Sequence, residues 1–265
     1  MADYTPVTLE AFADKSWQRN EDFSFAKQQT LVPLIASEVG TAAGVAPLAF
    51  VEIAGKMTLA MVCSLKPSQN LMVAPNGKWT IDFVPAVLRC HPFRLATSGE
   101  KYALAVDASS DLVSARGGGI PFFQADGAAP SAETKAVLQL LLDGHRGNAT
   151  TQRAATALAE AKVLEPWSIV IKGAEGEHQV GGLSKLNESA LNALTDEQFL
   201  LLRQSGALAI AYVQLISMNR LSLLQQLSEM HSASFASQAG YAKLLSPTGG
   251  AVDEKFDWET LFKST

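Results

Sequence analysis

Residues 47–65 read PLAFVEIAGKMTLAMVCSL, and this stretch decides the fold more than any other. Two apolar runs, 47–53 and 57–65, lie on either side of the short segment Ala54-Gly55-Lys56. Apolar runs of this length that are separated by a glycine-containing turn are typical of a β-hairpin. The stretch therefore predicts two antiparallel strands.

Further strands are expected on the C-terminal side of this hairpin. Residues 71–74 and 79–83 flank Asn76-Gly77, which is the strongest short-range hairpin signal in the chain. The ranges 92–96 and 102–106 predict two more strands. Toward the N-terminus, Pro33 limits residues 32–37 to an edge strand or an extended segment.

Helices are expected to dominate after Ser131. Helical spacing predicts a helix over 132–142, which Gly144 and Gly147 should break, and an alanine-rich helix over 150–162. A hairpin at 168–185 should join the earlier sheet, and helices follow from Asn187, from Asp196 and over 207–231. Because strands come first and helices later, the sequence predicts an α+β fold: a mostly antiparallel sheet from the N-terminal half with helices mainly from the C-terminal half.

The chain divides into three parts by its pattern. Residues 1–30 are expected to form an N-terminal arm that docks by its aromatic side chains, residues 31–231 a single α+β domain, and residues 232–265 a tail. With 265 residues, 48% of them hydrophobic, the chain can bury a core and is not intrinsically disordered. The net charge of −5 and the lack of a basic cluster argue against nucleic acid as a partner.

Familiar catalytic and cofactor motifs are missing from the sequence. There is no phosphate-binding GxxxxGK[ST], no dinucleotide-binding GxGxxG, no GxSxG and no HExxH. We therefore expect no cofactor and no metal, and lean against an enzyme. Cys63 and Cys90 are expected to be reduced thiols; the alternative, a disulfide between them, could be sustained only in an oxidising compartment.

Carboxylates that interrupt apolar runs are the first candidate site residues. Glu38 follows the run 34–37, and Asp107 ends the run 104–106, so both are candidate acids or bases. An aspartate that starts a turn is the commoner explanation for Asp107. His91 is expected to be a polar residue at a strand end rather than a ligand.

Two arginines add candidate anion-binding groups. Arg89, the third catalytic candidate, and Arg94 could each clamp a carboxylate or a phosphate, and with Trp79 they are the candidate ligand-binding residues. Pairing with an internal acid such as Asp107 or Asp82 is the favoured alternative.

The tail carries a cluster of large apolar side chains that is expected to bind a partner. These residues are Phe256, Trp258, Leu261 and Phe262. Exposed aromatic clusters are costly, so the segment should pack either on its own domain or on another subunit or partner protein.

The N-terminus shows no charged and apolar pattern of a secretory signal. The longest apolar run, 207–218, is shorter than the roughly 20 residues that span a bilayer and reads as a buried helix. We therefore expect a cytoplasmic protein without membrane insertion.

Several segments, taken in series, resemble the SapC-like proteins of bacteria, which are distinct from the similarly named peptide-transport permease. They are PLIASE (33–38), PLAFV (47–51), NLMV (70–73) with GKW (77–79), FVPAVLR (83–89) with PF (92–93), LAVD (104–107), PFF (121–123), LEPW (164–167), and IAYVQL (210–215) followed by SM (217–218). The resemblance covers about residues 30–225 and leaves out the first 25 residues and the tail.

This resemblance implies an accessory role and supplies no catalytic residues. SapC-like proteins are often encoded beside flavin-dependent halogenase-like proteins, cupin-like proteins and TonB-dependent receptors, which suggests nutrient uptake, glycan use or surface assembly. The resemblance is also compatible with association with the cell surface.

Three hypotheses follow. The leading one is a non-enzymatic accessory protein that binds a partner protein, a second copy or a small ligand. The second is an enzyme in which Arg89 holds an anion and Glu38 or Asp107 is the acid or base. The third is a structural component of a surface layer.

Overall fold

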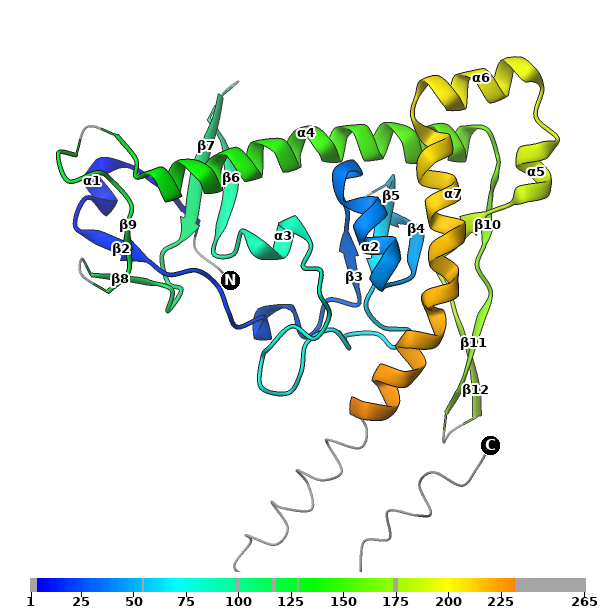
Figure 1. The fold of residues 1–265 in the computed structure, drawn as a ribbon, viewed down its shortest axis with the longest axis horizontal. Coiled ribbons are helices and arrows are strands. Elements are labelled where there is room, and N and C mark those ends of the chain that lie inside the picture. Colours follow the sequence, from blue (N-terminus) through cyan, green and yellow to red (C-terminus); the bar gives the residue numbers. More distant parts are fainter. Residues whose placement is uncertain are drawn as a thin grey trace, which may run out of the picture. The chain divides into compact units, whose positions relative to one another are not determined.

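The computed structural model describes residues 4–53, 55–98, 101–115, 118–127, 129–173 and 176–231. The described residues up to Ser228 belong to the first of two units into which the chain divides. The first unit has antiparallel sheets in its N-terminal half and its longer helices in the C-terminal half (Figure 1), which confirms the α+β prediction. The expected tail, with Phe256, Trp258, Leu261 and Phe262, lies outside the described residues.

In the described ranges the strands form four sheets, and all pairs are antiparallel. The largest sheet has the order β10 (Leu164–Pro166), β13 (Ser184–Leu186), β4 (Leu48–Ile53), β5 (Lys56–Val62) and β3 (Leu31–Pro33). The next has the order β1 (Tyr4–Pro6), β7 (Lys101–Asp107) and β6 (Phe93–Ser98). A third has the order β8 (Val113–Ala115), β2 (Lys15–Trp17) and β9 (Ile120–Pro121), and β11 (Ile169–Gly173) pairs with β12 (Gly176–Val180).

The labelled helices in the described ranges are α1 (Leu9–Phe12), α2 (Val39–Val45), α3 (Ala86–Arg89), α4 (Ala132–Glu160), α5 (Glu188–Asn192), α6 (Asp196–Gln204) and α7 (Ala207–Ser217). Residues 221–231 are also helical. Short 3-10 turns are η1 (Ser24–Ala26), η2 (Ala36–Glu38) and η3 (Met218–Arg220).

The hairpin at 47–65 forms as predicted. Strands β4 and β5 pair with Phe50 opposite Leu59, and both side chains are fully buried. Gly55 between them has φ +74°, a conformation that glycine adopts without a steric penalty. The strands β6 and β7 are also confirmed, as is the edge strand β3.

Two of the expected hairpins differ from the prediction. Near Asn76-Gly77 the chain does turn, with φ +83° at Gly77, but pairing is limited to a single bridge between Val73 and Trp79. The hairpin predicted at 168–185 does not join the main sheet as a unit. Instead β11 and β12 form their own sheet, and only β13, which follows them, pairs with β4 and β10.

Helix α4 runs without a break through Gly144 and Gly147, so the predicted interruption is wrong. It begins where the sequence suggested, because the Ser131 hydroxyl accepts a hydrogen bond from the Thr134 amide. Tertiary packing outweighs the low helix propensity of glycine. Glycine at position 147 allows Ile35 to pack closely against α4, because an added Cβ would lie 3.0 Å from Cβ of Ile35.

Helix α4 joins two hydrophobic clusters within the first unit. Its C-terminal part packs Ala155 and Leu158 into the larger cluster, around β3, β4 and β5, while Leu138 and Leu141 pack against the smaller one. The smaller cluster consists of the buried residues Phe12, Trp17, Phe93, Leu104, Val106 and Phe122. Phe12 and Trp17, which belong to the expected N-terminal arm, are therefore core residues of this cluster.

Helix α7 is fixed to the main sheet by two buried polar side chains. Gln214 accepts a hydrogen bond from the Leu186 amide at 3.0 Å and donates one to the Leu48 carbonyl at 3.1 Å. Ser217 accepts a hydrogen bond from the Leu48 amide at 3.0 Å. These side chains interrupt the apolar run because they satisfy backbone groups at the ends of β4 and β13.

One helical stretch, Ala207–His231, is long and apolar enough to cross a membrane by length and composition. Its most apolar window is 33% buried, and core helices of soluble proteins pass the same test. The part that forms α7 packs against α2 and α4.

Candidate functional site

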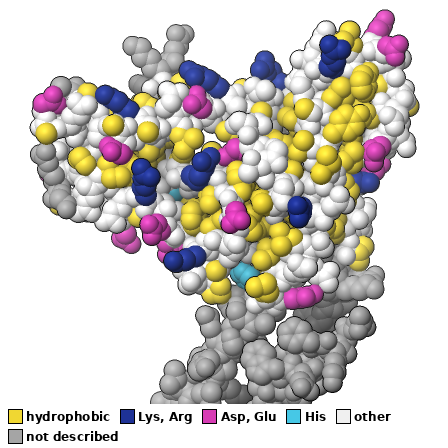
Figure 2. All heavy atoms as spheres, viewed as in Figure 1, with side chains coloured by type: hydrophobic (Ala, Val, Ile, Leu, Met, Phe, Trp, Pro, Cys, Tyr) yellow, Lys and Arg dark blue, Asp and Glu magenta, His cyan; other side chains and the backbone are white. Residues whose placement is uncertain are grey.

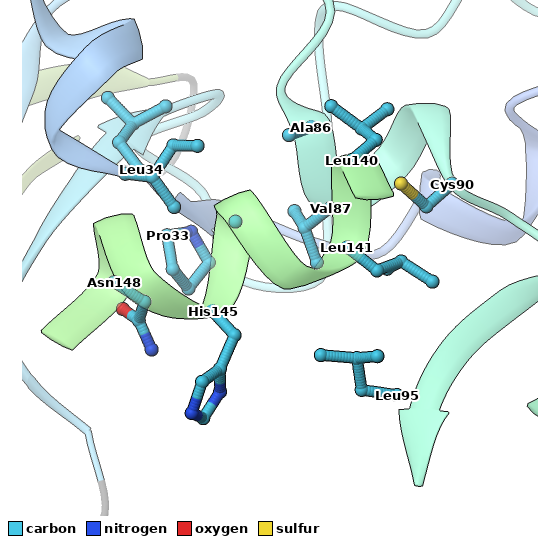
Figure 3. A pocket seen from close by; sticks show the side chains of 12 residues that line it. Pro33, Leu34, Ala86, Val87, Cys90, Leu95, Leu140, Leu141, His145 and Asn148 are labelled. Carbon is cyan, nitrogen blue, oxygen red and sulfur yellow. The ribbon is translucent and has the colours of Figure 1, made fainter. Parts of the chain in front are cut away.

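A cavity of about 320 Å³ lies where the two hydrophobic clusters meet, beside the middle of α4. Figure 3 shows side chains from β3, α3, β6 and α4 around it. The lining residues are Pro33, Leu34 and Ile35 in and after β3; Ala86, Val87 and Cys90 in and after α3; Leu95 of β6; and Leu140, Leu141, Gly144, His145 and Asn148 of α4. The volume lies at the small end of the range for small-molecule sites.

The walls of this pocket are apolar, and part of them is open to solvent. Val87 is 58% exposed although it is a large aliphatic residue. Gly144 faces open space, since an added Cβ would have no atom within 4 Å. The pocket lining thus has open space at Gly144.

Two polar side chains stand at one side of the pocket. His145 and Asn148 are three residues apart on α4, so they share a face of the helix (Figure 3). The imidazole Nε2 of His145 lies 2.7 Å from the Tyr102 hydroxyl. The Asn148 side-chain amide has no hydrogen-bond partner among the residues that the structure describes.

The cysteine in the pocket wall is a neutral thiol. Burial raises the pKa of Cys90 to about 11, although the charge of Arg89 acts in the opposite direction. Burial likewise raises the pKa of Cys63. Both cysteines are free. Because the thiolate is the nucleophilic form, neither residue is suited to nucleophilic catalysis near neutral pH.

The catalytic candidates Glu38 and Arg89 lie together, outside the pocket lining. The Glu38 carboxylate, 6% exposed, accepts hydrogen bonds from the Arg89 guanidinium at 3.0 Å and from the Ala86 amide at 2.7 Å. The acid expected to pair with Arg89 was Asp107 or Asp82, and the structure corrects this to Glu38.

Asp107 does not join that pair. Its Oδ1 accepts hydrogen bonds from the Ser109 amide at 3.1 Å and the Ser109 hydroxyl at 2.6 Å, as in an aspartate that starts a turn. The three catalytic candidates therefore do not converge on one cavity.

The remaining sequence candidates are held by structural contacts. The indole of Trp79 donates a hydrogen bond to the Phe83 carbonyl at 2.7 Å, and the Arg94 guanidinium lies 3.6 Å from the centre of the Tyr4 ring. His91 follows Cys90, the C-terminal cap of α3, and stacks on Phe25, with ring centres 4.0 Å apart. Burial lowers the pKa of His91, while the Asp107 charge acts to raise it. None of Trp79, Arg94 and His91 lines the pocket.

Sequence reasoning missed the polar residues of the pocket. His145 is exposed, as expected of a surface residue, but its place in the pocket lining was not foreseen, and Asn148 was not considered. A continuous helix over 132–160 places Leu141, Gly144, His145 and Asn148 on neighbouring positions of one face. The sequence analysis did not predict this face, because it expected Gly144 and Gly147 to break the helix. Among the described residues, no group of three or more His, Cys, Asp or Glu side chains could hold a metal ion.

A sequence model of the SapC family matches residues 7–224 of this chain. The match begins well before residue 30, so the expectation that the first 25 residues lie outside the family is wrong. No match is found among curated proteins or among solved structures.

Proposed function

This chain belongs to the SapC family, and we propose that it is a non-enzymatic accessory protein that binds a small, mainly apolar ligand. The observation that carries the proposal is the pocket beside α4, with its apolar walls and the open space at Gly144. Burying apolar ligand surface contributes roughly 25 cal/mol per Å², so such walls favour an apolar body.

The contacts of Glu38 support binding rather than catalysis. Its carboxylate is buried and already occupied by two donors, Arg89 and Ala86. A general base must reach the proton that it removes, and Glu38 does not line the pocket. The enzyme alternative required a cavity in which these groups converge, and it is accordingly the weaker proposal.

A second candidate function, binding of a partner protein or a second copy, is favoured by exposed apolar side chains on α6 and α7. Leu200, Leu201, Tyr212 and Ile216 are each at least 45% exposed. Figure 2 shows hydrophobic side chains gathered over these helices at the right of the view. Light scattering of the full chain tests this candidate: an assembly that Ile216→Glu dissociates supports it, and a monomer contradicts self-association.

The proposal for the wider biological role rests on the family resemblance alone. We propose that ligand binding serves nutrient or glycan uptake or surface assembly in the cytoplasm or at the cell surface. A structural role in a surface layer is the remaining alternative.

Native mass spectrometry of the chain from cells that make it tests ligand binding. We expect a small bound species on the wild-type protein, released on denaturation. Gly144→Leu should lack this species, because Gly144 lines the pocket and has open space into which the larger side chain can extend. Gly44→Leu is the matched control, since Gly44 is an exposed helical glycine on α2 with no atom near an added Cβ. A wild-type chain of bare mass, or equal occupancy in Gly144→Leu, would contradict the proposal.

A further inference from the structure

We infer that the ligand is a monocarboxylic acid with an apolar body, whose carboxylate binds at His145 and Asn148. The inference rests on the proposed function, because it names the class of molecule that the same pocket takes. It is carried by the two polar side chains at the edge of otherwise apolar walls.

Asn148 offers donors that the protein itself does not use. Its side chain is half-buried in the pocket lining and is not hydrogen-bonded to any described residue. An amide NH₂ group has two donor hydrogens. A ligand that reaches this end of the pocket therefore meets an available donor next to apolar walls.

His145 is oriented by Tyr102. The Tyr102 hydroxyl contacts Nε2 at 2.7 Å, and the rings pack with centres 4.6 Å apart. When this hydroxyl donates, the proton of the neutral imidazole is on Nδ1, which has no hydrogen bond among the described residues. The exposed His145 and the half-buried Asn148 then each have one or more donors that the described residues do not use, and a carboxylate at this edge of the pocket can accept from both.

The charges near the pocket disfavour a cationic head group. No acidic side chain is among the lining residues. The nearest acid along α4, Asp143, is exposed and pairs with Arg146 at 3.3 Å. A carboxylate is therefore matched by donors, whereas an ammonium group would find no carboxylate partner in the lining.

Calorimetric titration with three probes of equal chain length tests the head group. The probes are octanoate, 1-octanol and octylammonium. We expect the wild-type protein to bind octanoate about tenfold more tightly than either of the others, since hydrogen bonds to an ionised acceptor are the stronger ones.

The variant Asn148→Asp keeps the size of the side chain and reverses its electrostatics. It should weaken octanoate binding about tenfold or more and strengthen octylammonium binding, so that the preference is reversed. The control Asn192→Asp changes an exposed asparagine on α5 and should retain the wild-type preference. A thermal melt establishes that each variant is folded.

The outcomes separate this inference from the proposed function. If 1-octanol binds as tightly as octanoate, or if Asn148→Asp leaves the preference unchanged, the carboxylate inference is wrong while ligand binding stands. If none of the three probes binds the wild-type protein, the proposed function itself is contradicted.

Discussion

The Glu38 carboxylate lies 3.0 Å from the Arg89 guanidinium and also holds the amide of Ala86, the first residue of α3. One buried acid thus connects the end of η2 to both ends of a four-residue helix. That helix supplies Ala86 and Val87 to the pocket wall. The pair positions the wall of the binding site, which explains a charged residue after an apolar run without assigning it to catalysis.

Loss of the arginine should destabilise the fold. In Arg89→Met, the buried Glu38 carboxylate keeps only the Ala86 amide, and we expect the free energy of unfolding to fall by about 1–3 kcal/mol. Glu38→Gln should cost less, because an amide oxygen can still accept from Ala86. Urea unfolding measures both changes. The control Glu52→Gln, at an exposed position on β4, should stay within about 0.5 kcal/mol of wild type, and an Arg89→Met variant equal to that control would contradict the role of the pair.

The two glycines of α4 should respond in opposite ways to alanine. Gly144→Ala places a methyl group in open space and should stabilise the protein by about 0.5–1 kcal/mol through helix propensity. Gly147→Ala places one 3.0 Å from Cβ of Ile35, and overpacking typically costs about 1–3 kcal/mol. Thermal and urea unfolding should therefore rank Gly144→Ala above wild type and Gly147→Ala below it. Equal stabilities would show that Ile35 does not pack closely against α4.

Gln214 should be among the most sensitive polar positions. Replacing it by leucine keeps the helix but leaves the Leu186 amide and the Leu48 carbonyl without their partner. We expect a loss of about 2–6 kcal/mol in the free energy of unfolding, at about 1–3 kcal/mol for each of the two buried groups left unsatisfied. Gln204→Leu, on the exposed end of α6, is the matched control. A Gln214→Leu protein as stable as this control would show that the hydrogen bonds of Gln214 to Leu186 and Leu48 do not stabilise the fold.

His91 should make stability depend on pH. Burial lowers its pKa in the folded state, so the folded protein favours the neutral ring, while the unfolded pKa is about 6.5. Between these two values the unfolded chain binds more protons, and stability falls as the pH decreases. The contribution of the neutral ring is complete above the unfolded pKa and is lost as the pH falls through the folded one.

The variant His91→Phe keeps a ring to stack on Phe25 and removes this titration. Wild type should therefore lose more stability than the variant between pH 7.5 and pH 5 in urea unfolding. Identical losses in the two proteins would argue against a half-buried His91 that favours the neutral ring.

The sequence correctly predicted the elements that depend on residues close together in the chain. The hairpin of β4 and β5, the pair β6 and β7, and the Ser131 cap of α4 follow from turn residues, apolar alternation and capping. The α+β class followed from their order along the chain.

The pocket could not be predicted, because it depends on contacts between distant segments. Local propensity placed a break at Gly144 and Gly147, whereas packing at both ends keeps α4 continuous. Without that helix, His145 and Asn148 have no common face. The role of Gln214 could not be predicted either, because its partners, Leu186 on β13 and Leu48 on β4, are distant in the sequence.

Methyl NMR of the wild-type chain, titrated with 1-octanol, tests the central claim most directly. This uncharged probe makes the result independent of the head-group inference. Saturable shifts should be confined to methyl groups of the pocket, such as those of Val87, Leu95 and Leu141, while Leu59 in the main sheet stays unchanged. Shifts restricted to the exposed side chains of α6 and α7, or no saturable shift at all, would contradict a ligand-binding pocket beside α4.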